Sequence, residues 1–245
     1  MNTINENLTT LTVTYNNKDE LDRTLLSLLD VSCKPKKIII IDGGSTDGSI
    51  DLIKNYQLDL PQIDLISEKD DGIFHAMNKG KKMLSTKLVH YLTAGDFLNG
   101  DPYKDIDSPC LLPVVFIDEN GEKCGKDQIK LFGTQYNHQG MILPSDHNDY
   151  DTSLWIGADY KMSLEAYPMG LNRNMFKNNG SVTYQLGGLS SQKTTLGRIH
   201  MLIGIFKVRP LLAIPVSFAI IFKNLIPRRI RRLLLKHEVM NNFRI

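Results

Sequence analysis

The chain has 245 residues, a formal net charge of +2 at pH 7 and three cysteines. This length is sufficient for one large domain with an appendage and a substantial core. The small net charge argues against nucleic acid as the main partner. The cysteines are widely spaced and form no Cys-x-x-Cys pair, which argues against a zinc site and a disulfide framework. Residues 1–10 lack the pattern of a secretory signal, so we expect a protein of the reducing cytosol.

The first hundred residues alternate between predicted strands and helices. The predicted strands are residues 11–15, 38–41, 63–67 and 88–92. Apolar residues at helical spacing occupy the intervals between them. Short connections between alternating strands and helices are typical of a parallel sheet with right-handed crossovers. The four consecutive isoleucines at 38–41 predict a strand covered on both faces.

The turn after this isoleucine run has the composition of a ligand-binding turn. Asp42 ends the strand, and Gly43 and Gly44 permit a sharp turn. Ser45 or Asp47 can cap the helix that follows. In open α/β sheets, ligands bind at the carboxyl ends of the strands, and an acid there can accept from a nucleobase. The alternative is an ordinary strand-to-helix turn, and neither Gly-x-Gly-x-x-Gly nor a phosphate-binding Gly-Lys-Ser/Thr loop is present.

The pattern is less regular after Pro102. Residues 111–118 and 128–132 are expected to form strands around a turn that contains Asn120-Gly121, because Asn-Gly favours a hairpin. Polar residues with interspersed aromatics at 136–159 predict site-forming loops. A short helix is expected from Ala158 or Asp159 to Tyr167, since Pro168 would end it.

The C-terminal segment is basic and apolar. From residue 200 onward the single acid Glu238 faces Lys207, Arg209, Lys223, Arg228, Arg229, Arg231, Arg232, Lys236 and Arg244. Charges and prolines interrupt its apolar runs, so none reaches the roughly 20 residues of a membrane-crossing helix. We expect an amphipathic helical segment that lies on an anionic membrane surface. The alternative is a helical hairpin packed on the main domain.

Four side chains lie at or just beyond the carboxyl ends of predicted strands. They are Tyr15, Asp42, Asp70 and Asp96. Parallel strands bring these ends to one edge of the sheet. An aromatic ring for stacking, an acid for a base edge and further carboxylates for a metal or sugar hydroxyls together predict a nucleotide-sugar pocket.

The motifs that contain these residues resemble those of the family 2 glycosyltransferases, in particular bacterial enzymes of capsule, O-antigen or colanic acid-type polysaccharide synthesis. The matching motifs are Thr-Val-Thr-Tyr-Asn-Asn (12–17), Ile-Asp-Gly-Gly-Ser-Thr-Asp-Gly-Ser (41–49), Ser-Glu-Lys-Asp-Asp-Gly-Ile-Phe-His-Ala-Met-Asn-Lys-Gly (67–80) and His-Tyr-Leu-Thr-Ala-Gly-Asp (90–96). A weaker resemblance continues through His138-Gln139, Gly157-Ala158-Asp159-Tyr160 and the basic tail.

The resemblance implies a GT-A fold, which is an α/β, Rossmann-like, mostly parallel sheet flanked by helices. It implies a glycosyltransferase domain at 1–198, with a nucleotide-sugar-binding half at 1–101 and an acceptor-side half at 102–198. Residues 199–245 would then be the basic, membrane-associating helical segment.

The resemblance also implies roles for the donor-side residues. Tyr15 would lie against the nucleobase with Thr14 and Asn16 nearby. Asp42 would accept a hydrogen bond from the base, and Gly44 and Ser45 would border the nucleotide. Contacts to ribose, diphosphate or donor sugar would come from Asp70, Asn78 and Lys79.

The chemistry is implied for two further acids. Asp96 matches the last acid of the Asp-x-Asp motif, which holds a divalent cation, Mg²⁺ or Mn²⁺, on the diphosphate. Asp159 matches the acceptor-side acid, which acts as general base in a single displacement with inversion; the alternative is a helix N-cap. Ala94 replaces the first acid of the metal motif, and His75 stands where relatives carry an acid. His138 is expected to be a hydrogen-bonded structural histidine.

The expected function is therefore an inverting glycosyltransferase of bacterial surface polysaccharide synthesis. It would act at the inner face of the cell membrane on a nucleotide-sugar donor and a lipid-linked glycan acceptor, with no nucleic acid partner. One alternative is a sugar-phosphate nucleotidylyltransferase, although residues 15–18 lack the glycine-rich basic loop of such enzymes. Another is a non-catalytic, membrane-bound scaffold of a polysaccharide-assembly complex, which the missing metal acid favours.

Overall fold

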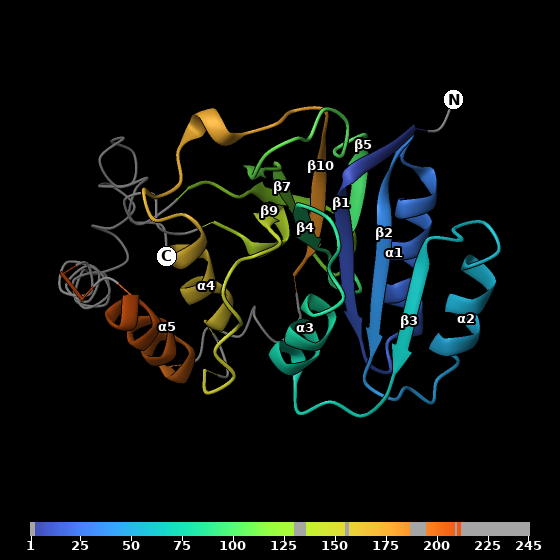
Figure 1. Cartoon of the computed structure of the whole chain (residues 1–245), viewed down its shortest axis with the longest axis horizontal. Coiled ribbons are helices and arrows are strands. Elements are labelled where there is room, and N and C mark those ends of the chain that lie inside the picture. The colour runs from blue at the N-terminus through green and yellow to red at the C-terminus, as the bar shows by residue number, and fades with distance from the viewer. Residues whose placement is uncertain (1–2, 130–135, 155–156, 187–194, 209, 212–245) are drawn as a thin grey trace.

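A six-stranded sheet in the order β3-β2-β1-β4-β9-β6 forms the centre of the computed structural model (Figure 1). The structure describes residues 3–129, 136–154, 157–186, 195–208 and 210–211. The strands of this sheet are β1 (Thr3–Thr14), β2 (Cys33–Asp42), β3 (Ile63–Ser67), β4 (Leu88–Tyr91), β6 (Cys110–Leu111) and β9 (Met141–Pro144). Strands β1 to β4 pair in parallel, whereas β9 is antiparallel to both β4 and β6. The predicted α/β fold with a mostly parallel sheet is confirmed.

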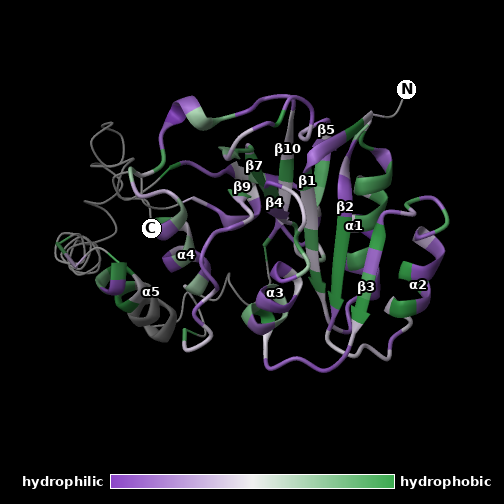
Figure 2. Ribbon diagram, in the orientation of Figure 1, coloured by the Kyte–Doolittle hydropathy of each residue, from purple (hydrophilic) through white to green (hydrophobic). Residues whose placement is uncertain are grey.

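The isoleucine run of β2 lies at the centre of the core. Ile38, Ile39, Ile40 and Ile41 all have 0% exposure, so both faces of this strand are covered, as the sequence predicts. Figure 2 shows the continuous hydrophobic stretch along β2. The sequence predicts the first strand at 11–15, whereas β1 covers Thr3–Thr14, because its polar first half also pairs with β2.

Three helices follow the first three strands, as expected. They are α1 (Lys18–Asp30), α2 (Ser49–Tyr56) and α3 (Ile73–Lys81). Helices α1 and α2 pack against each other, while α3 packs on β1 and β2. A Cβ on Gly80 would lie 2.6 Å from Leu11 Cδ1 and 3.0 Å from Ile41 Cγ1, so glycine is what lets α3 approach the sheet so closely.

A second sheet in the order β5-β10-β7-β8 stands beside the first. Its strands are β5 (Phe97–Gly100), β7 (Val114–Ile117), β8 (Lys123–Lys126) and β10 (Gly180–Gln185). The predicted hairpin around Asn120-Gly121 is present as β7 and β8. Its return strand lies at 123–126 and not at 128–132, because Asp118 Oδ1 accepts from the Asn120 and Glu122 N–H groups and closes the turn early. Residues 130–132 lie outside the described ones.

The remaining elements lie on the acceptor side of the sequence. They are η1 (His138–Gly140), α4 (Ala158–Ala166), η2 (Arg173–Met175) and α5 (Thr195–Val208). Helix α4 begins and ends where the sequence predicts. Helix α5 packs on α4, with Ile205 buried and Gly204 close to Lys161.

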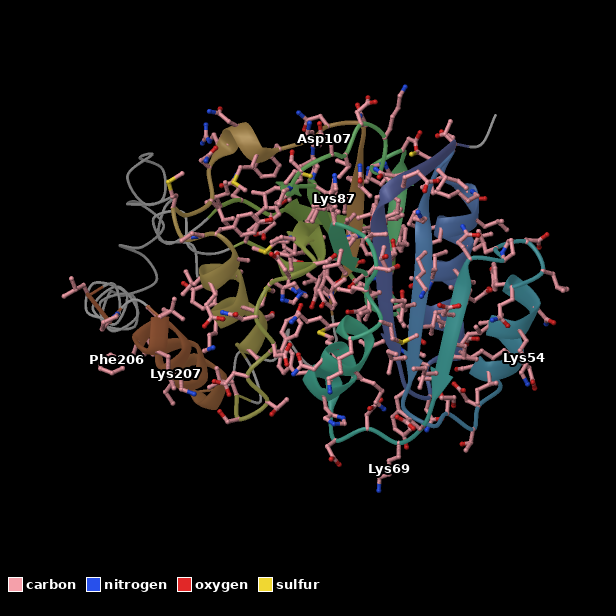
Figure 3. All side chains as sticks on the ribbon, in the orientation of Figure 1. Lys54, Lys69, Lys87, Asp107, Phe206 and Lys207 are labelled. Atoms are coloured by element: carbon pink, nitrogen blue, oxygen red, sulfur yellow. The ribbon has the colours of Figure 1, made fainter. Side chains whose placement is uncertain are left out.

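Helix α5 covers the start of the predicted C-terminal segment, and most of that segment, 212–245, lies outside the described residues. Ile203 and Phe206 are exposed on α5, and Phe206 and Lys207 lie at its outer end (Figure 3). Within the described part of the chain, no helix is both long enough and apolar enough to cross a membrane. The expected membrane association stays a prediction.

Candidate functional site

The carboxyl ends of β1, β2 and β3 bring three polar residues into line. Thr14 pairs with Asp42 in the β1–β2 register, and Asp42 pairs with Ser67 in the β2–β3 register. The loop after β4 joins the same edge, because the Ala94 N–H donates to the Val13 carbonyl at 3.4 Å. The edge expected from the sequence is therefore present.

Asp42 is fully buried, and its two carboxylate oxygens differ in their surroundings. Oδ2 accepts from the Gly44 N–H at 3.0 Å, the Ser45 N–H at 2.9 Å and the Ser67 hydroxyl at 2.6 Å. These donors offset the desolvation of the carboxylate. Oδ1 has no hydrogen-bond partner among the described residues. One oxygen thus holds the turn, and the other is left to accept from a ligand.

The loops after β1 and β2 are joined by hydrogen bonds in both directions. The Asn16 N–H donates to Ser45 Oγ at 2.8 Å, and Asn16 Oδ1 accepts from the Thr46 N–H at 2.8 Å. Asn16 adopts a φ of 48°, which asparagine tolerates better than most residues. Asp47 accepts from the Lys18 N–H at 2.9 Å and from the Ser49 N–H at 3.0 Å, so it joins the first loop to the start of α2. The N-cap of α2 is Gly48, so neither Ser45 nor Asp47 is the cap that the sequence predicts. The two loops form one unit.

Tyr15 presents its ring at this edge. Its side chain is 63% exposed, and a Cβ on Gly43 would lie only 3.1 Å from Tyr15 Cδ2. Glycine at position 43 therefore lets one part of the ring rest on the turn while the rest stays open. An exposed aromatic face beside a buried acid suits the stacking of a nucleobase.

A compact charged group lies where β3 leads into α3. Lys79 Nζ is 2.5 Å from Asp70 Oδ1 and 2.7 Å from Glu68 Oε1, and His75 Nδ1 is 3.3 Å from the same Asp70 oxygen. The Asp70 side chain is 7% exposed, and its Oδ2 has no hydrogen-bond partner among the described residues. The expected donor contacts Asp70 and Lys79 are thus held together, and His75 belongs to the same group.

Asn78, which the sequence predicts to contact the nucleotide-sugar donor, forms hydrogen bonds within the protein. Its side chain donates to the Tyr150 carbonyl at 2.9 Å and accepts from the Tyr150 N–H at 2.8 Å. Both ends of the amide therefore bind the loop between β9 and α4. In this structure Asn78 joins the two halves of the chain, and its contact to the donor stays a prediction.

Asp96 lies between β4 and β5 and is 6% exposed. Burial raises its pKa to about 8, and its Oδ1 accepts from the Gln185 N–H at 3.3 Å. The amide oxygen of Gln185 is buried without a hydrogen-bond partner among the described residues. Oxygen atoms of this kind fit Mg²⁺ or Mn²⁺. No group of three or more histidine, cysteine or acidic residues gathers here in the described part, so bound phosphates would have to supply further ligands.

Asp159 lies in the first turn of α4 and is half-buried. The N-cap is Gly157, with a φ of 94°, so Asp159 is not the cap of this helix. Burial raises the pKa of Asp159, and its Oδ1 accepts from the Tyr160 N–H at 2.8 Å. Burial and the nearby charge of Asp159 both raise the pKa of Tyr150, which in turn is bonded to Asn78 on α3. The acid of the second half is thereby linked to the donor side.

The sequence motif His138-Gln139 contributes more than its resemblance suggests. The Gln139 amide accepts from the Thr93 N–H at 3.0 Å and donates to Thr93 Oγ1 at 2.7 Å, which fixes the loop that carries Asp96. His138 is buried and its Nε2 lies 2.8 Å from the Tyr150 hydroxyl, as expected for a structural histidine. The sequence marks Gln139 through the resemblance of His138-Gln139 but assigns it no role, and for Tyr150 it offers only the polar, aromatic character of 136–159.

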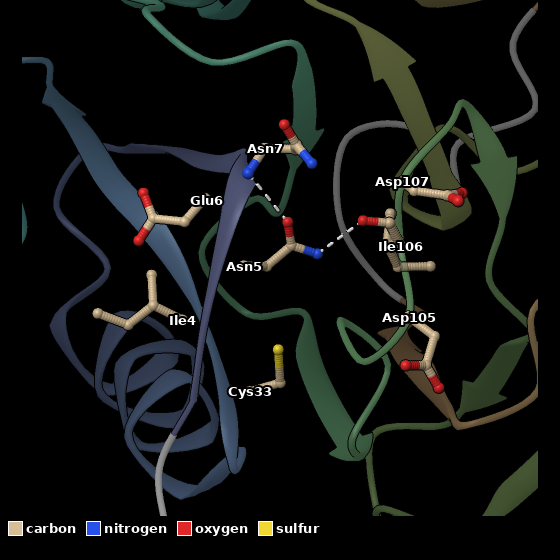
Figure 4. Close-up of a pocket in the computed structure, with 8 residues that line it drawn as sticks. All are labelled: Ile4, Asn5, Glu6, Asn7, Cys33, Asp105, Ile106 and Asp107. Carbon is tan, nitrogen blue, oxygen red and sulfur yellow. Dashed lines mark hydrogen bonds between the residues drawn. The ribbon is translucent and has the colours of Figure 1, made fainter.

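A pocket separate from this site lies near the amino ends of β1 and β2 (Figure 4). Its lining includes Asn5, Cys33 and Asp105. The Asn5 side chain donates to the carbonyls of Tyr103 at 3.0 Å and Ile106 at 2.8 Å. These bonds tie β1 to the 103–106 turn, so the polar groups of this pocket have a structural task.

Known proteins resemble the chain mainly in its first half. Residues 9–103 match the model of glycosyl transferase family 2. The glycosyltransferase YibD of Escherichia coli is 31% identical over 96 residues, which are 39% of this chain and 28% of YibD. A poly-beta-1,6-N-acetyl-D-glucosamine synthase of Staphylococcus aureus is 32% identical over 104 residues, 42% of this chain and 25% of the synthase. The chain thus aligns with about a quarter of the length of these relatives.

Solved structures resemble a larger part of the chain. S. aureus TarS (residues 1–349) in complex with UDP-GlcNAc has a TM-score of 0.58 at 16% identity and covers 82% of this chain and 67% of the TarS chain. A mannosyltransferase of Pyrobaculum calidifontis in complex with GDP-Man and Mn²⁺ has a TM-score of 0.55 at 14% identity, covering 94% of this chain and 79% of its own. At such identities the likeness concerns the fold, which is of the GT-A type.

Proposed function

We propose that the protein is a glycosyltransferase that moves a sugar from a nucleotide-sugar donor to a lipid-linked glycan acceptor, with inversion at the anomeric carbon. The match of residues 9–103 to the model of glycosyl transferase family 2 supports this proposal. The observation that supports the proposal is that Tyr15, Asp42 and Asp96 lie at or after the carboxyl ends of β1, β2 and β4, which pair in parallel and so share one edge of the sheet. The bond from Asn78 to Tyr150 supports the proposal further, because it links this edge to the loop beside Asp159.

The donor-binding part of the mechanism uses the first two loops. The open face of Tyr15 stacks on the nucleobase, and the unpartnered Asp42 Oδ1 accepts a hydrogen bond from a ring N–H of that base. Gly44 and Ser45 border the nucleotide. Lys79 neutralises negative charge on the diphosphate once it exchanges one of its two carboxylate partners for a phosphate oxygen.

The transfer step is assigned to Asp159. Its carboxylate takes the proton of the acceptor hydroxyl while that oxygen bonds to the anomeric carbon and the bond from this carbon to the diphosphate breaks. Burial raises the pKa of Asp159, which makes its carboxylate a stronger base. The nucleoside diphosphate leaves with the electron pair of the broken bond.

A divalent cation fits the surroundings of Asp96. The residues that would hold it are Asp96 and, through its amide oxygen, Gln185. When bound, the cation supplies positive charge that stabilises the leaving diphosphate. Such a charge would also offset the burial that raises the pKa of Asp96 to about 8.

The acceptor and the place of action follow from the basic tail. Residues 199–245 carry many arginines and lysines with apolar residues, which suits the anionic inner face of a bacterial membrane. Lipid-linked glycans of surface polysaccharide synthesis are presented at such a face. Exposed Ile203 and Phe206 beside Lys207 on α5 have the matching amphipathic composition.

The proposal is tested with purified protein, acceptor lipid, Mn²⁺ and a panel of UDP-, GDP- and dTDP-sugars. We expect release of one nucleoside diphosphate that depends on the acceptor. Asp159→Asn should lower kcat by about a thousandfold, since general-base catalysis contributes about 10²–10⁴-fold. The same variant should keep the rise in melting temperature that the nucleoside diphosphate causes.

Asp146→Asn is the matched control, because Asp146 is an exposed acid between β9 and α4. It should keep full activity. Full activity of Asp159→Asn would remove Asp159 from its role. Nucleotide binding without any transfer across the panel would instead favour a non-catalytic scaffold.

A further inference from the structure

Three buried atoms near the carboxyl edge of the sheet have no hydrogen-bond partner among the described residues. They are Asp42 Oδ1, Asp70 Oδ2 and Lys79 Nζ. Buried polar atoms are nearly always hydrogen-bonded in folded proteins, so a group of such atoms indicates the place of a ligand. Two carboxylate oxygens and one ammonium suit a ligand that brings both hydrogen-bond donors and an anion, as a nucleotide-sugar does.

The Lys79 ammonium lies between two carboxylates. Its Nζ is 2.5 Å from Asp70 Oδ1 and 2.7 Å from Glu68 Oε1, but neither contact has the geometry of a hydrogen bond. Burial of Lys79 lowers its pKa, but the two carboxylates outweigh this effect and raise the pKa overall. Contact with Lys79 lowers the pKa of Glu68. Lys79 and Glu68 are therefore both charged near neutral pH.

The two carboxylates beside Lys79 differ in exposure. The Asp70 side chain is 7% exposed, and the oxygen that meets Lys79 also lies 3.3 Å from His75 Nδ1. Without Lys79, a buried carboxylate would keep only this exposed imidazole beside it, which is costly. The Glu68 side chain is 61% exposed, so water would hydrate it once it left Lys79, and exposed ion pairs contribute little. Glu68 is thus the partner that Lys79 gives up more readily.

The backbone of Glu68 is fixed to the turn that is expected to border the nucleotide. Its N–H donates to the Asp42 carbonyl at 3.0 Å, and a Cβ on Gly44 would lie 3.8 Å from the Glu68 carbonyl carbon. Lys69, the next residue, extends away from the molecule (Figure 3), and the Glu68 carboxylate pairs with Lys79 instead. The residue that covers Lys79 is therefore part of the wall beside this turn.

We propose that Glu68 is an internal competitor of the donor's diphosphate. Its carboxylate holds Lys79 until the nucleotide-sugar binds; a phosphate oxygen then takes the place of Glu68, while Asp70 stays paired with Lys79. The inference rests on the proposed function, in which Lys79 meets the diphosphate. Glu68 thereby increases the selectivity for ligands that carry phosphate, because an uncharged nucleoside gains nothing by displacing a carboxylate from Lys79.

The competition is measured by calorimetry. The ligands are UDP, GDP and dTDP, of which the tightest binder is used further, and the matching nucleoside. Glu68→Gln keeps the size of the side chain and removes its charge, so the dissociation constant of the diphosphate should fall by about two- to fivefold. That of the nucleoside should stay the same. Unchanged or weaker binding of the diphosphate, or an equal gain for the nucleoside, would overturn the proposal.

Asp71→Asn is the matched control, because Asp71 is an exposed acid on the same loop. It removes the same charge and should leave both dissociation constants close to the wild-type values. A gain as large as that of Glu68→Gln would mean that net charge alone acts, which would overturn the specific role of Glu68. The melting temperatures of the variants without nucleotide check that they are folded.

A double-mutant cycle connects the effect to Lys79. Lys79→Gln should raise the dissociation constant of the diphosphate, and the addition of Glu68→Gln to this variant should then change nothing further. A gain from Glu68→Gln that persists without Lys79 would overturn the proposed exchange of partners.

Failure of the proposed function would be distinguishable from failure of this inference. If the wild-type protein binds the diphosphate but transfers no sugar across the panel, the transfer reaction is overturned, whereas the competition at Lys79 is still decided by the binding constants. If none of the three nucleoside diphosphates binds the wild-type protein, the donor site and the role of Glu68 are overturned together.

Discussion

Asp42 accepts hydrogen bonds from the turn with Oδ2 and leaves Oδ1 for a ligand. Substitutions can separate these two roles. Asp42→Asn keeps an acceptor for the Gly44 and Ser45 N–H groups but replaces Oδ1 with a donor. We expect the dissociation constant of the donor to rise about 10–100-fold, which is about 1.4–2.8 kcal/mol. Calorimetry with the nucleoside diphosphate measures this change.

Asp42→Ala is the comparison, because it removes both tasks. It should weaken donor binding similarly and also lower the free energy of unfolding by about 1–3 kcal/mol, since the turn donors lose a charged partner. Urea unfolding gives that value. A donor affinity that stays at the wild-type level in both variants would remove Asp42 from the nucleotide site.

We expect the buried Asp96 to lower the stability of the folded protein at pH 7. Its pKa rises from 3.8 to about 8 on folding, so at pH 7 the unfolded state gains from ionisation and the folded state does not. Asp96→Asn removes this difference and should raise the melting temperature at pH 7 by a few degrees, at about 2–4 °C for each kcal/mol. The gain should shrink as the pH falls toward 3.8 and vanish well below it, where the carboxyl group is protonated in both states.

The same variant should lose the effect of the cation. In the wild-type protein, Mn²⁺ should increase the thermal shift caused by the nucleoside diphosphate, and in Asp96→Asn this increase should vanish. Differential scanning fluorimetry with and without Mn²⁺ measures both effects. A lower melting temperature of Asp96→Asn at pH 7 would contradict the stability argument.

The position of helix α3 depends on Gly80. Gly80→Ala would set a Cβ 2.6 Å from Leu11 Cδ1 and 3.0 Å from Ile41 Cγ1, so the helix must move away from the sheet. We expect a loss of about 1–3 kcal/mol in the free energy of unfolding. Donor affinity should fall as well, because α3 carries Lys79 and holds Tyr150 through Asn78.

Gly125→Ala is the control for this substitution. A Cβ on Gly125 would meet only Phe116 Cδ2, at 3.9 Å, so the change should be close to neutral. Chemical denaturation of both variants makes the comparison. Equal stability of Gly80→Ala and the wild-type protein would mean that α3 has more room than its contacts indicate.

Elements with local signals were predictable from the sequence, and elements defined by distant partners were not. The isoleucines of β2 and the leucines of α1 follow the periods of a buried strand and an amphipathic helix. The first half of β1 is polar and is a strand only because it pairs with β2. β10 is placed between β5 and β7 by pairings such as Val182 with Leu98 and with Val114, for which no local pattern exists.

The same division applies to the site. Tyr15, Asp42 and Asp96 follow strands, so their convergence follows from the parallel order of the sheet. The bond from Asn78 to Tyr150 joins residues 72 positions apart. Its existence depends on the path of the 145–154 loop, which the sequence indicated only as polar. The task of Tyr150 could therefore be found only from the structure.

At the scale of the whole molecule, two of the three buried histidines in the described part of the chain have strongly lowered pKa values, which makes stability depend on pH. Burial lowers the pKa of His90 to about 4 and that of His138 to about 3. In the unfolded chain a histidine titrates near 6.5, so the unfolded state binds protons first as the pH falls. The free energy of unfolding should therefore decrease from about pH 6.5 to about pH 4, by up to about 1.4 kcal/mol per pH unit for each histidine.

The slope of the free energy of unfolding against pH gives the number of protons that the unfolded state binds in excess of the folded state. His90→Gln should reduce the slope by about one proton, whatever it does to the overall stability. Urea unfolding at several pH values between 4 and 7 gives the slope. A constant free energy of unfolding across this range would show that neither buried histidine stays neutral.

The joined loops after β1 and β2 also bear on how such a site can be exchanged between proteins. Asn16 completes the hydrogen bonding of the second loop, and Ser45 completes that of the first. A chimera that imports either loop alone would leave donors and acceptors of the other unsatisfied. To change the base specificity of this scaffold, residues 14–18 and 42–49 would therefore have to be exchanged together. They are separate in the sequence, but they complete each other's hydrogen bonds.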